Sequence, residues 1–596
     1  MFSFWLIIKG ISTLALADET PEMVTKVAVG ERATPDPMMD PLMQTAHTEL
    51  MRAHRFFATL PEPTHWIQVA ITDSIDQQII ATDGVLSQDM SSHRRLVDID
   101  LRVGTPELDS THKMLDGGFG SGQIHFSELV AITTDPKPLK MLLWRGLDES
   151  YRASLRRYIQ IKSNTQIKVD REDQSADFSH APAQRAHLPT TPLQLEKQVW
   201  AQQLREISLF ASAHPEIVFS QISVSAELNT RRIVSTDGSA IVEPRTHYRV
   251  AAMAQSVAED GMELMAYDYI DFVDRFPDKE TLAALMNTAI RTAIDLRAAP
   301  AIDPYVGPAI LKGRAAAVFF HEILGHRIEG HRQKDEDESG TLADKVGEQI
   351  FPPFLSITDD PTLTHWNGVA LNGHYIYDDE AVKSETVNIV EDGILRNFVM
   401  SRAPIEAQAT SNGHGRREPG EIPVARQGNL IVSANSESES RVSAAQLKQE
   451  LIQEIKKQGK PFGLIFDDIS GGFTFTGRAT PNSYAVKPVT VWKLYPDGRE
   501  ELVRGVDMIG TPLITFSRIA MASVETQVFN GVCGAESGWV PVSAISPDLL
   551  VTEVEVQRRS KDHERPPLLE PPGTESQPAK KSLLDSPKSA LNGGLQ

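Results

Sequence analysis

The spacing of apolar and polar residues predicts two strand-rich blocks in the first half of the chain. In residues 65–103 the pattern has a period of two, and from Val97 to Val103 every second residue is aliphatic. Such alternation is typical of a strand with one buried face. A second strand-rich block covers residues 217–271. Each block contains an Asp-Gly pair, which favours a tight turn between strands, at Asp83-Gly84 and Asp237-Gly238.

Helical spacing surrounds these blocks, because elsewhere apolar residues recur every three or four positions. The segments concerned are residues 43–57, 140–162, 193–212 and 278–297. Residues 163–192 are polar and irregular, and we expect them to form an exposed connection. Pro300 and Pro304 follow the last of these helices, so a domain boundary is expected near residue 300.

Beyond residue 300 the pattern predicts one helix over residues 312–330 and then mostly strands. Asp-Gly pairs at Asp392 and Asp497 indicate two more hairpins. One helix interrupts them at 443–458, where Ser443 and Gln446 have the spacing of a capping box. The chain is therefore expected to be α+β. An N-terminal α/β domain, 41–300, precedes a β-rich C-terminal domain, 301–556, with the 312–330 helix at their junction.

The two ends of the chain lack the composition of a packed core. Residues 1–17 are apolar and end in Ala-Leu-Ala, which favours a secretory signal, although Lys9 interrupts the run. We expect export on this basis, with a cytoplasmic location as the alternative. Residues 18–40 are expected to be a flexible leader and 557–596 a disordered tail. The first run is too short to span a membrane, and no other stable span is expected.

Charge and cysteine content narrow the classes of function. Among the 596 residues, 59 basic against 80 acidic side chains give a formal charge of −21. That balance argues against nucleic-acid binding, which needs a basic surface. The single cysteine, Cys533, excludes an intrachain disulfide. Alone it is either a small buried apolar residue or a ligand or nucleophile.

Three titratable residues, His321, Glu322 and His326, lie inside the otherwise apolar 312–330 helix. Two imidazoles and a carboxylate suit a zinc-type site, in which the carboxylate takes a proton from water. The histidines are five residues apart, about 140° around an ideal helix. They share a face only if the helix is deformed, so we predict an unwound or π-type turn at 322–326, with Gly325 accepting the distortion.

A different geometry uses Glu322, His326 and Glu329, which are spaced four and three residues apart and form a regular stripe. That stripe could bind iron or manganese, or it could be a buried hydrogen-bonded network. The sequence alone leaves both arrangements open.

Three ordered blocks resemble one known family. The first is His321-Glu322, then His326, then Glu329-Gly330; the second is Asn412-Gly413-His414-Gly415-Arg416-Arg417-Glu418; the third is Met508-Ile509-Gly510 followed by Asn530-Gly531-Val532-Cys533-Gly534. Together they resemble the TldD/PmbA family of metallopeptidases, strongly from 300 to 556 and weakly before that.

The resemblance implies that zinc (Zn²⁺) is held by His321, His326 and Cys533, with Glu322 as the general base. It also implies a dimer enclosing a cavity, either a homodimer or a heterodimer with a metal-free paralogue. An enclosed site admits unfolded or short peptides as substrates. The alternative function is a non-catalytic peptide-binding or partner subunit, because some relatives lack the histidines.

Four further residues are candidates for contact with substrate. Arg416 and Arg417 could bind a carboxylate or steady an oxyanion, His414 could support the site, and Gly472 could let the backbone approach the substrate. The chain departs from the family pattern at His331, where an Asp is expected.

Overall fold

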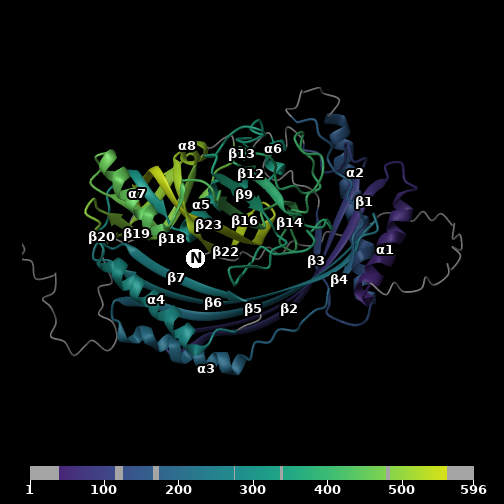
Figure 1. Cartoon of the computed structure of the whole chain (residues 1–596). Coiled ribbons are helices and arrows are strands. Elements are labelled where there is room, and N and C mark those ends of the chain that lie inside the picture. The colour runs from purple at the N-terminus through teal and green to yellow at the C-terminus, as the bar shows by residue number, and fades with distance from the viewer. Residues whose placement is uncertain are drawn as a thin grey trace, which may run out of the picture. The chain divides into compact units, whose positions relative to one another are not determined.

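The computed structural model describes residues 39–113, 125–164, 173–273, 276–335, 338, 340–477 and 483–559 (Figure 1). The segment expected to be a signal, nearly all of the expected leader, and the expected tail from residue 560 lie outside these residues. None of the helices in the described ranges combines the length and apolarity that crossing a membrane requires.

The N-terminal half forms a mainly antiparallel sheet with four helices. Its elements are α1 (Pro41–Phe57), β1 (Thr64–Thr82), β2 (Val85–Val103), β3 (Phe126–Leu129), α2 (Lys137–Asn164), β4 (Arg185–His187), α3 (Lys197–Ser208), a 3-10 turn (Leu209–Ala213), β5 (Ile217–Ser235), β6 (Ala240–Val257), β7 (Glu263–Phe272) and α4 (Lys279–Ala298). The strand order is β3-β2-β1-β5-β6-β4, with β7 also paired to β6. Both predicted hairpins are present, as β1–β2 and β5–β6.

The predicted connection 163–192 is wrong in one part. Residues Arg185–His187 form β4, which pairs in parallel with β6. Three residues are too short to produce a periodic signal, and the pairing partner lies more than fifty residues downstream.

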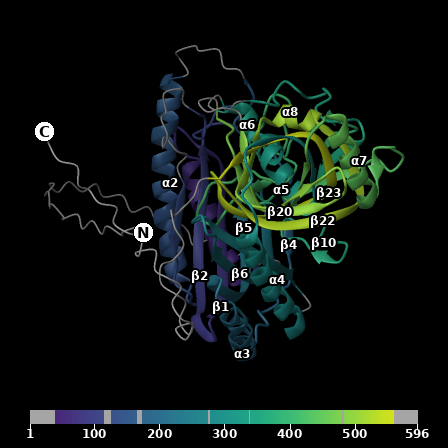
Figure 2. The same cartoon turned by 90° about the vertical axis from the view of Figure 1, so that its left-hand side faces the viewer.

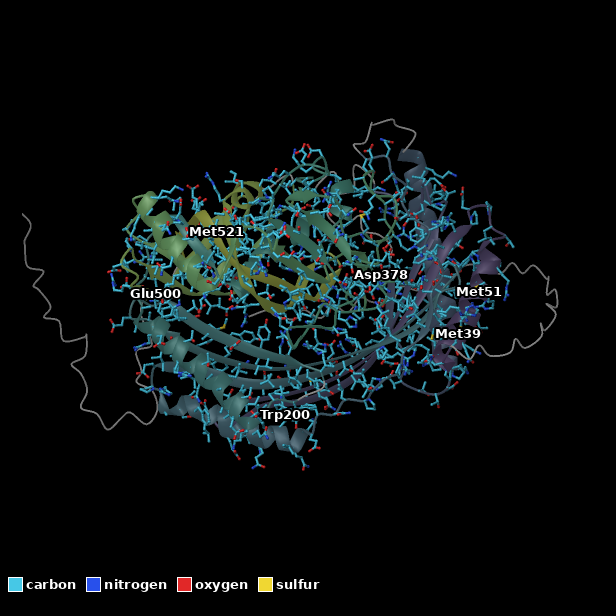
Figure 3. The ribbon with its side chains drawn as sticks, in the orientation of Figure 1. Met39, Met51, Trp200, Asp378, Glu500 and Met521 are labelled. Atoms are coloured by element: carbon cyan, nitrogen blue, oxygen red, sulfur yellow. The ribbon has the colours of Figure 1, made fainter. Side chains whose placement is uncertain are left out.

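The two faces of this sheet differ in chemistry because side chains alternate along each strand. On one face, residues such as Ile67, Val69 and Val250 pack against α1–α4 in two apolar clusters. Figure 3 labels Trp200, which lies on α3 in one of them. The opposite face carries polar side chains, including Thr72 and Arg231, and faces the C-terminal region. Figure 1 shows α3 and α4 on one side of the sheet and the C-terminal strands on the other.

The C-terminal half builds a second, larger sheet in the order β13-β12-β9-β16-β23-β21-β19-β18-β8, with β17, β20 and β22 attached. Its elements are β8 (Tyr305–Leu311), α5 (Gly313–Ile323), α6 (His331–Lys334), β9 (Leu355–Asp359), β10 (His365–Trp366), β11 (Val369–Ala370), β12 (Val387–Glu391), β13 (Ile394–Leu395), β14 (Gly415–Arg416), β15 (Val424–Ala425), β16 (Asn429–Ala434), β17 (Arg441–Val442), α7 (Ala444–Lys457), β18 (Gly463–Thr474), β19 (Tyr484–Leu494), β20 (Glu500–Val503), β21 (Val506–Gly510), α8 (Pro512–Ser517), β22 (Ile519–Ala535) and β23 (Gly538–Arg558).

The helix α5 lies inside the curve of this sheet, as Figure 2 shows for its position relative to β22 and β23. Its apolar residues, including Phe319 and Phe320, belong to the largest core cluster, which draws only on residues from 302 onward. The helix α7 packs on the outer side through Leu447 and Leu451, and its predicted capping box is confirmed. The α+β class predicted from the sequence is therefore confirmed.

Candidate metal centre

The helix that carries the two histidines is interrupted between them. α5 ends at Ile323, Leu324 forms a turn with φ −108° and ψ −49°, and Gly325–Ile328 continue as a 3-10 helix. The single helix predicted over 312–330 is therefore wrong beyond residue 323. The interruption predicted at 322–326 is present, as an unwound turn without a π-type segment.

Gly325 is favoured at this turn by close packing and not by backbone freedom. A Cβ built on Gly325 would overlap the carboxamide of Gln427. Its φ is not among the positive values found at other glycines in the described residues. The turn packs directly beneath this buried side chain, so a residue with a Cβ at position 325 would require the Gln427 carboxamide to move.

Three potential metal donors converge where this turn meets β22. The donor atoms of His321, His326 and Cys533 all lie within 4.8 Å of one another. Cys533 Sγ lies 3.3 Å from His326 Nε2. The two imidazole rings are 5.4 Å apart at their centroids and inclined by 72°. Nδ1 of His321 is buried and has no hydrogen-bond partner within the described part of the chain.

The electrostatics of the three groups favour a thiolate between imidazoles. Burial alone would raise the pKa of the Cys533 thiol, but the charges of His326 and His321, with hydrogen bonds to both rings, lower it well below its usual value. Burial would lower the pKa of His326, yet Cys533 and Glu329 raise it well above the ordinary range. The lowered pKa favours the thiolate form of Cys533, and a thiolate beside two imidazoles is a donor set suited to zinc.

Glu322 lies in the same cavity but makes a different contribution. Its side chain is buried, and burial raises the pKa of its carboxyl, while the charges of His321 and His326 oppose that rise. Gly472 on β18 lies directly against it, and a Cβ on Gly472 would come within 2.9 Å of Glu322 Cγ. A carboxylate with a raised pKa beside metal-binding groups is the usual arrangement for proton transfer.

Glu329 orients His326 from behind. Its Oε2 lies 3.2 Å from His326 Nδ1 and accepts a 2.9 Å hydrogen bond from Arg332 Nε. Its Oε1 lies 3.2 Å from Arg426 Nε, and Arg426 Nη2 donates to the Cys533 carbonyl at 2.8 Å. These contacts leave His326 Nε2 facing Cys533.

The stripe Glu322–His326–Glu329, considered from the sequence, does not lie along one helix, because α5 ends at Ile323. Glu329, His331 and Glu536 also form a group close enough to hold a cation. Arg332 already supplies positive charge there, because it pairs with both Glu329 and Glu536.

A cavity of about 480 Å³ opens over these donors. The 470–476 stretch and the β22–β23 hairpin form most of its wall, and Arg332 and Glu536 contribute charge. Its apolar lining includes Phe473 and Trp539, whose side chains are 44% and 62% exposed. Trp539 packs over Gly534, the residue after Cys533. The site therefore combines a buried polar floor with an exposed aromatic rim.

Comparison with known proteins agrees with this geometry. Residues 305–558 match the model of the PmbA/TldA metallopeptidase C-terminal domain. A protein named "Metalloprotease TldD homolog" from Haemophilus influenzae is 25% identical over 482 residues, which cover 78% of this chain and 94% of that protein. A "Zinc metalloprotease TldD homolog" from Saccharolobus solfataricus is 24% identical over 350 residues, 58% of this chain and 72% of the relative.

The crystal structure of TldE from Thermococcus kodakarensis shares the fold, with a TM-score of 0.55 at 13% identity, covering 86% of this chain and all (100%) of that one. The predicted resemblance to the TldD/PmbA family is therefore confirmed.

Not every candidate named from the family pattern lies at this cavity. Gly472 lines it, whereas His414, Arg416 and Arg417 do not. His414 is fully buried between Asn412 and Asp359. Arg417 pairs with Asp100 of β2 at 3.0 Å and so connects the C-terminal region to the N-terminal sheet.

Arg416, also buried, donates a 2.7 Å hydrogen bond to the Pro541 carbonyl and stacks on Tyr375, with 4.6 Å between guanidinium and ring centroid. His331, where the TldD/PmbA pattern has an Asp, pairs with Glu536 at the rim.

Several residues around the site were not predicted from the sequence. Arg332, Arg426 and Glu536 form the ion-pair network behind His326, and Trp539 forms the rim. Arg332 and Glu536 each lie three residues beyond a predicted site residue, Glu329 and Cys533, and that proximity is the only sequence signal available. Trp539 is placed by the pairing of β22 with β23, and Arg426 directly follows β15; no local pattern encodes either position.

Proposed function

We propose that this TldD/PmbA-family chain is a zinc-dependent peptidase that hydrolyses peptide bonds in unfolded or short peptides. The observation that carries the proposal is the convergence of His321, His326 and Cys533, with the Glu322 carboxyl in the same cavity. Relatives named metalloproteases, one of them a zinc metalloprotease, support it.

The donor set fits zinc. Ligand distances of about 2.0–2.3 Å in a tetrahedral site separate the donors by about 3.3–3.8 Å, and Cys533 Sγ lies 3.3 Å from His326 Nε2. The unpartnered ring nitrogen of His321 and the lowered pKa of Cys533 also favour a bound cation. Three protein ligands leave one position open, as in catalytic zinc sites.

The zinc ion would supply Lewis acidity toward the scissile carbonyl and the attacking water. Glu322 is positioned to take the proton from that water and then to deliver it to the amine that leaves. The pKa of Glu322 is raised in the direction of neutral pH, where a carboxyl can both accept and return a proton efficiently. Gly472 brings the β18 backbone beside this carboxyl and leaves room for a substrate chain.

A pairing of chains is part of the proposal. The fold likeness to TldE supports a dimer, either of two copies or with a paralogous subunit. The alternative function is a chain that binds peptides without cleaving them. Such a chain would retain the cavity, and changing Glu322 would not reduce its peptide binding.

The decisive experiment measures zinc content and peptide release together. Wild-type protein should contain zinc and cleave an unstructured peptide, and a chelator should abolish cleavage. Cys533→Ala should lose zinc, whereas Glu322→Gln should retain zinc and lose at least about 100-fold in rate. Glu385→Gln, an exposed carboxylate outside the cavity, is the matched control. Unchanged zinc in Cys533→Ala would contradict the ligand set, and full cleavage by Glu322→Gln would remove its role as base.

A further inference from the structure

A second and larger cavity adjoins the metal centre. It has a volume of about 760 Å³ and lies against the polar face of the N-terminal sheet, with the C-terminal segments 364–379 and 416–419 opposite. Figure 3 labels Asp378, one of its lining residues. Val532 and Trp539 line both this cavity and the one over the metal donors. The two spaces therefore share part of one wall.

Two guanidinium groups in this larger cavity have no ion-pair partner within the described part of the chain. Arg245 on β6 donates from Nη2 to the Asn372 carbonyl at 3.1 Å and contacts the Asn372 side chain. Arg416 on β14 donates to the carbonyls of Gln427 and Pro541. Among the described residues, neither arginine takes part in an ion pair.

Other arginines lining the same cavity behave differently. Arg231 pairs with Glu243 and Asp379, and Arg417 pairs with Asp100. Some arginines in the cavity wall therefore form ion pairs with carboxylates, whereas Arg245 and Arg416 donate hydrogen bonds only to carbonyl oxygens of the described residues. All four side chains line the same cavity, so the difference in ion pairing depends on where each arginine lies in the wall.

Burying two guanidinium groups without an ion-pair partner is costly, even in a cavity that acidic side chains also line. Burial lowers the pKa of Arg245, and the charge of Arg416 lowers it further, against the opposing charges of Glu227 and Asp271. Those two acids are engaged elsewhere: Glu227 with Asn229, and Asp271 with Arg249 and His247. An anion bound between Arg245 and Arg416 would offset this cost.

We propose that Arg245 and Arg416 bind the C-terminal carboxylate of a peptide that extends past Trp539 to the metal centre. This inference rests on the proposed peptidase function. A planar guanidinium matches a planar carboxylate and can donate two parallel hydrogen bonds to it. Arg416 is held by two carbonyls and the Tyr375 ring, whereas Arg245 retains N–H groups that have no acceptor among the described residues.

The substrate class that follows is a short peptide with a free C-terminus, cleaved a few residues from that end. Peptides that carry a C-terminal amide would lose the charged hydrogen bonds and bind more weakly. Charged hydrogen bonds contribute about 1.5–3 kcal/mol, so the expected loss of affinity is about 10- to 100-fold.

The test measures equilibrium binding of trialanine and trialanine amide to the Glu322→Gln variant, in which hydrolysis is suppressed. Trialanine should bind at least about 10-fold more tightly than its amide. Arg245→Gln should abolish this preference, and Arg245→Lys should restore part of it. Arg94→Gln, which removes an arginine from the same cavity that already pairs with Asp76, should leave the preference unchanged.

Each contrary outcome identifies its cause. Equal binding of acid and amide, or no binding of either, would overturn the inference. Inorganic phosphate that binds through Arg245 without competing with trialanine would assign the pocket to a free anion and also overturn it. Hydrolysis assays on the wild-type protein distinguish a failure of the carboxylate site from a failure of the proposed peptidase function. Equal cleavage of acid and amide peptides leaves the peptidase standing without the carboxylate site. A binding preference without any cleavage leaves the carboxylate site and removes the peptidase.

Discussion

Glu329 is the buried carboxylate that contacts His326 at the candidate metal centre. It is fully buried and contacts His326, Arg332 and Arg426. Burial would raise the pKa of its carboxyl, but these three neighbours lower it to about 2. A charged carboxylate behind His326 selects the ring tautomer that presents Nε2 to Cys533, which is the usual device for orienting a metal-binding histidine.

Replacing this carboxylate should weaken metal binding without removing any metal ligand. We expect Glu329→Gln to lose about 10- to 100-fold in zinc affinity and to lower the melting temperature, because Arg426 is left buried without an acidic partner. Competition with a chromophoric chelator measures the affinity. Glu338→Gln is the matched control, since Glu338 also pairs with Arg332 at 2.8 Å but does not contact His326. Equal zinc affinity in both variants would contradict the orienting role.

The turn at Gly325 makes a prediction about stability. Gly325→Ala should destabilise the protein by about 1–3 kcal/mol, the usual range for an overpacked site, because the new methyl group would overlap Gln427. Chemical denaturation measures the change. The double variant Gly325→Ala, Gln427→Ala should recover most of the loss, since it removes the obstructing carboxamide. A single variant as stable as the parent would show that the turn can shift.

At the scale of elements, one charged cluster connects the N-terminal sheet with the C-terminal region. Asp98 and Asp100 on β2 contact His125, and Asp100 pairs with Arg417, which follows β14. Burial would raise the pKa of Asp100, but Arg417 and His125 lower it to about 2. Burial would lower the pKa of His125, but the hydrogen bonds and charge of the two aspartates raise it to about 9.

These shifts predict a stability maximum bounded on both sides. The lowered pKa of Asp100 stabilises the fold above pH 3.8, and that contribution is lost as the pH falls toward 2. The raised pKa of His125 stabilises it below pH 6.5, and that contribution is lost as the pH rises through 9. Denaturation at several pH values should show a loss of about 2–3 kcal/mol at each end. His125→Asn should flatten the alkaline limb; an unchanged limb would show that other groups produce it.

At the scale of the whole molecule, the depth of the candidate site would restrict the proposed peptidase to extended substrates. The three donor residues are at most 7% exposed, and the cavity above them holds about 480 Å³. A single extended chain fits such a space, but a folded domain cannot bring a peptide bond to its floor. The exposed aromatic rim at Phe473 and Trp539 offers apolar contact to an unfolded chain.

Cleavage should therefore depend on the folded state of the substrate. Reduced and carboxymethylated ribonuclease should be cleaved at least about 100-fold faster than native ribonuclease, because local unfolding of the native form is rare. Fragment release followed by mass spectrometry measures both rates. Comparable rates would mean that the cavity opens far more widely than the described residues indicate.

Local pattern was sufficient for most of the elements, because a periodic burial signal depends only on neighbouring positions. The helices α1, α4 and α7 and the hairpins β1–β2 and β5–β6 lie where the sequence predicts them. The interruption between His321 and His326 was predicted from their spacing and from the assumption that both bind one metal, since residues five positions apart do not share a face of a regular helix.

Long-range pairing was decided only by the tertiary structure. Cys533 reaches the histidines because β22 pairs with β23 in a register that opposes Cys533 to Val540, while α5 packs inside the same strands. The sequence implied this ligand only through family resemblance. Arg416 and Arg417 are adjacent and chemically equivalent in the sequence, yet Arg417 is neutralised by Asp100 and Arg416 is not. Local periodicity carries no information about such partners, because they come from strands that are hundreds of residues away.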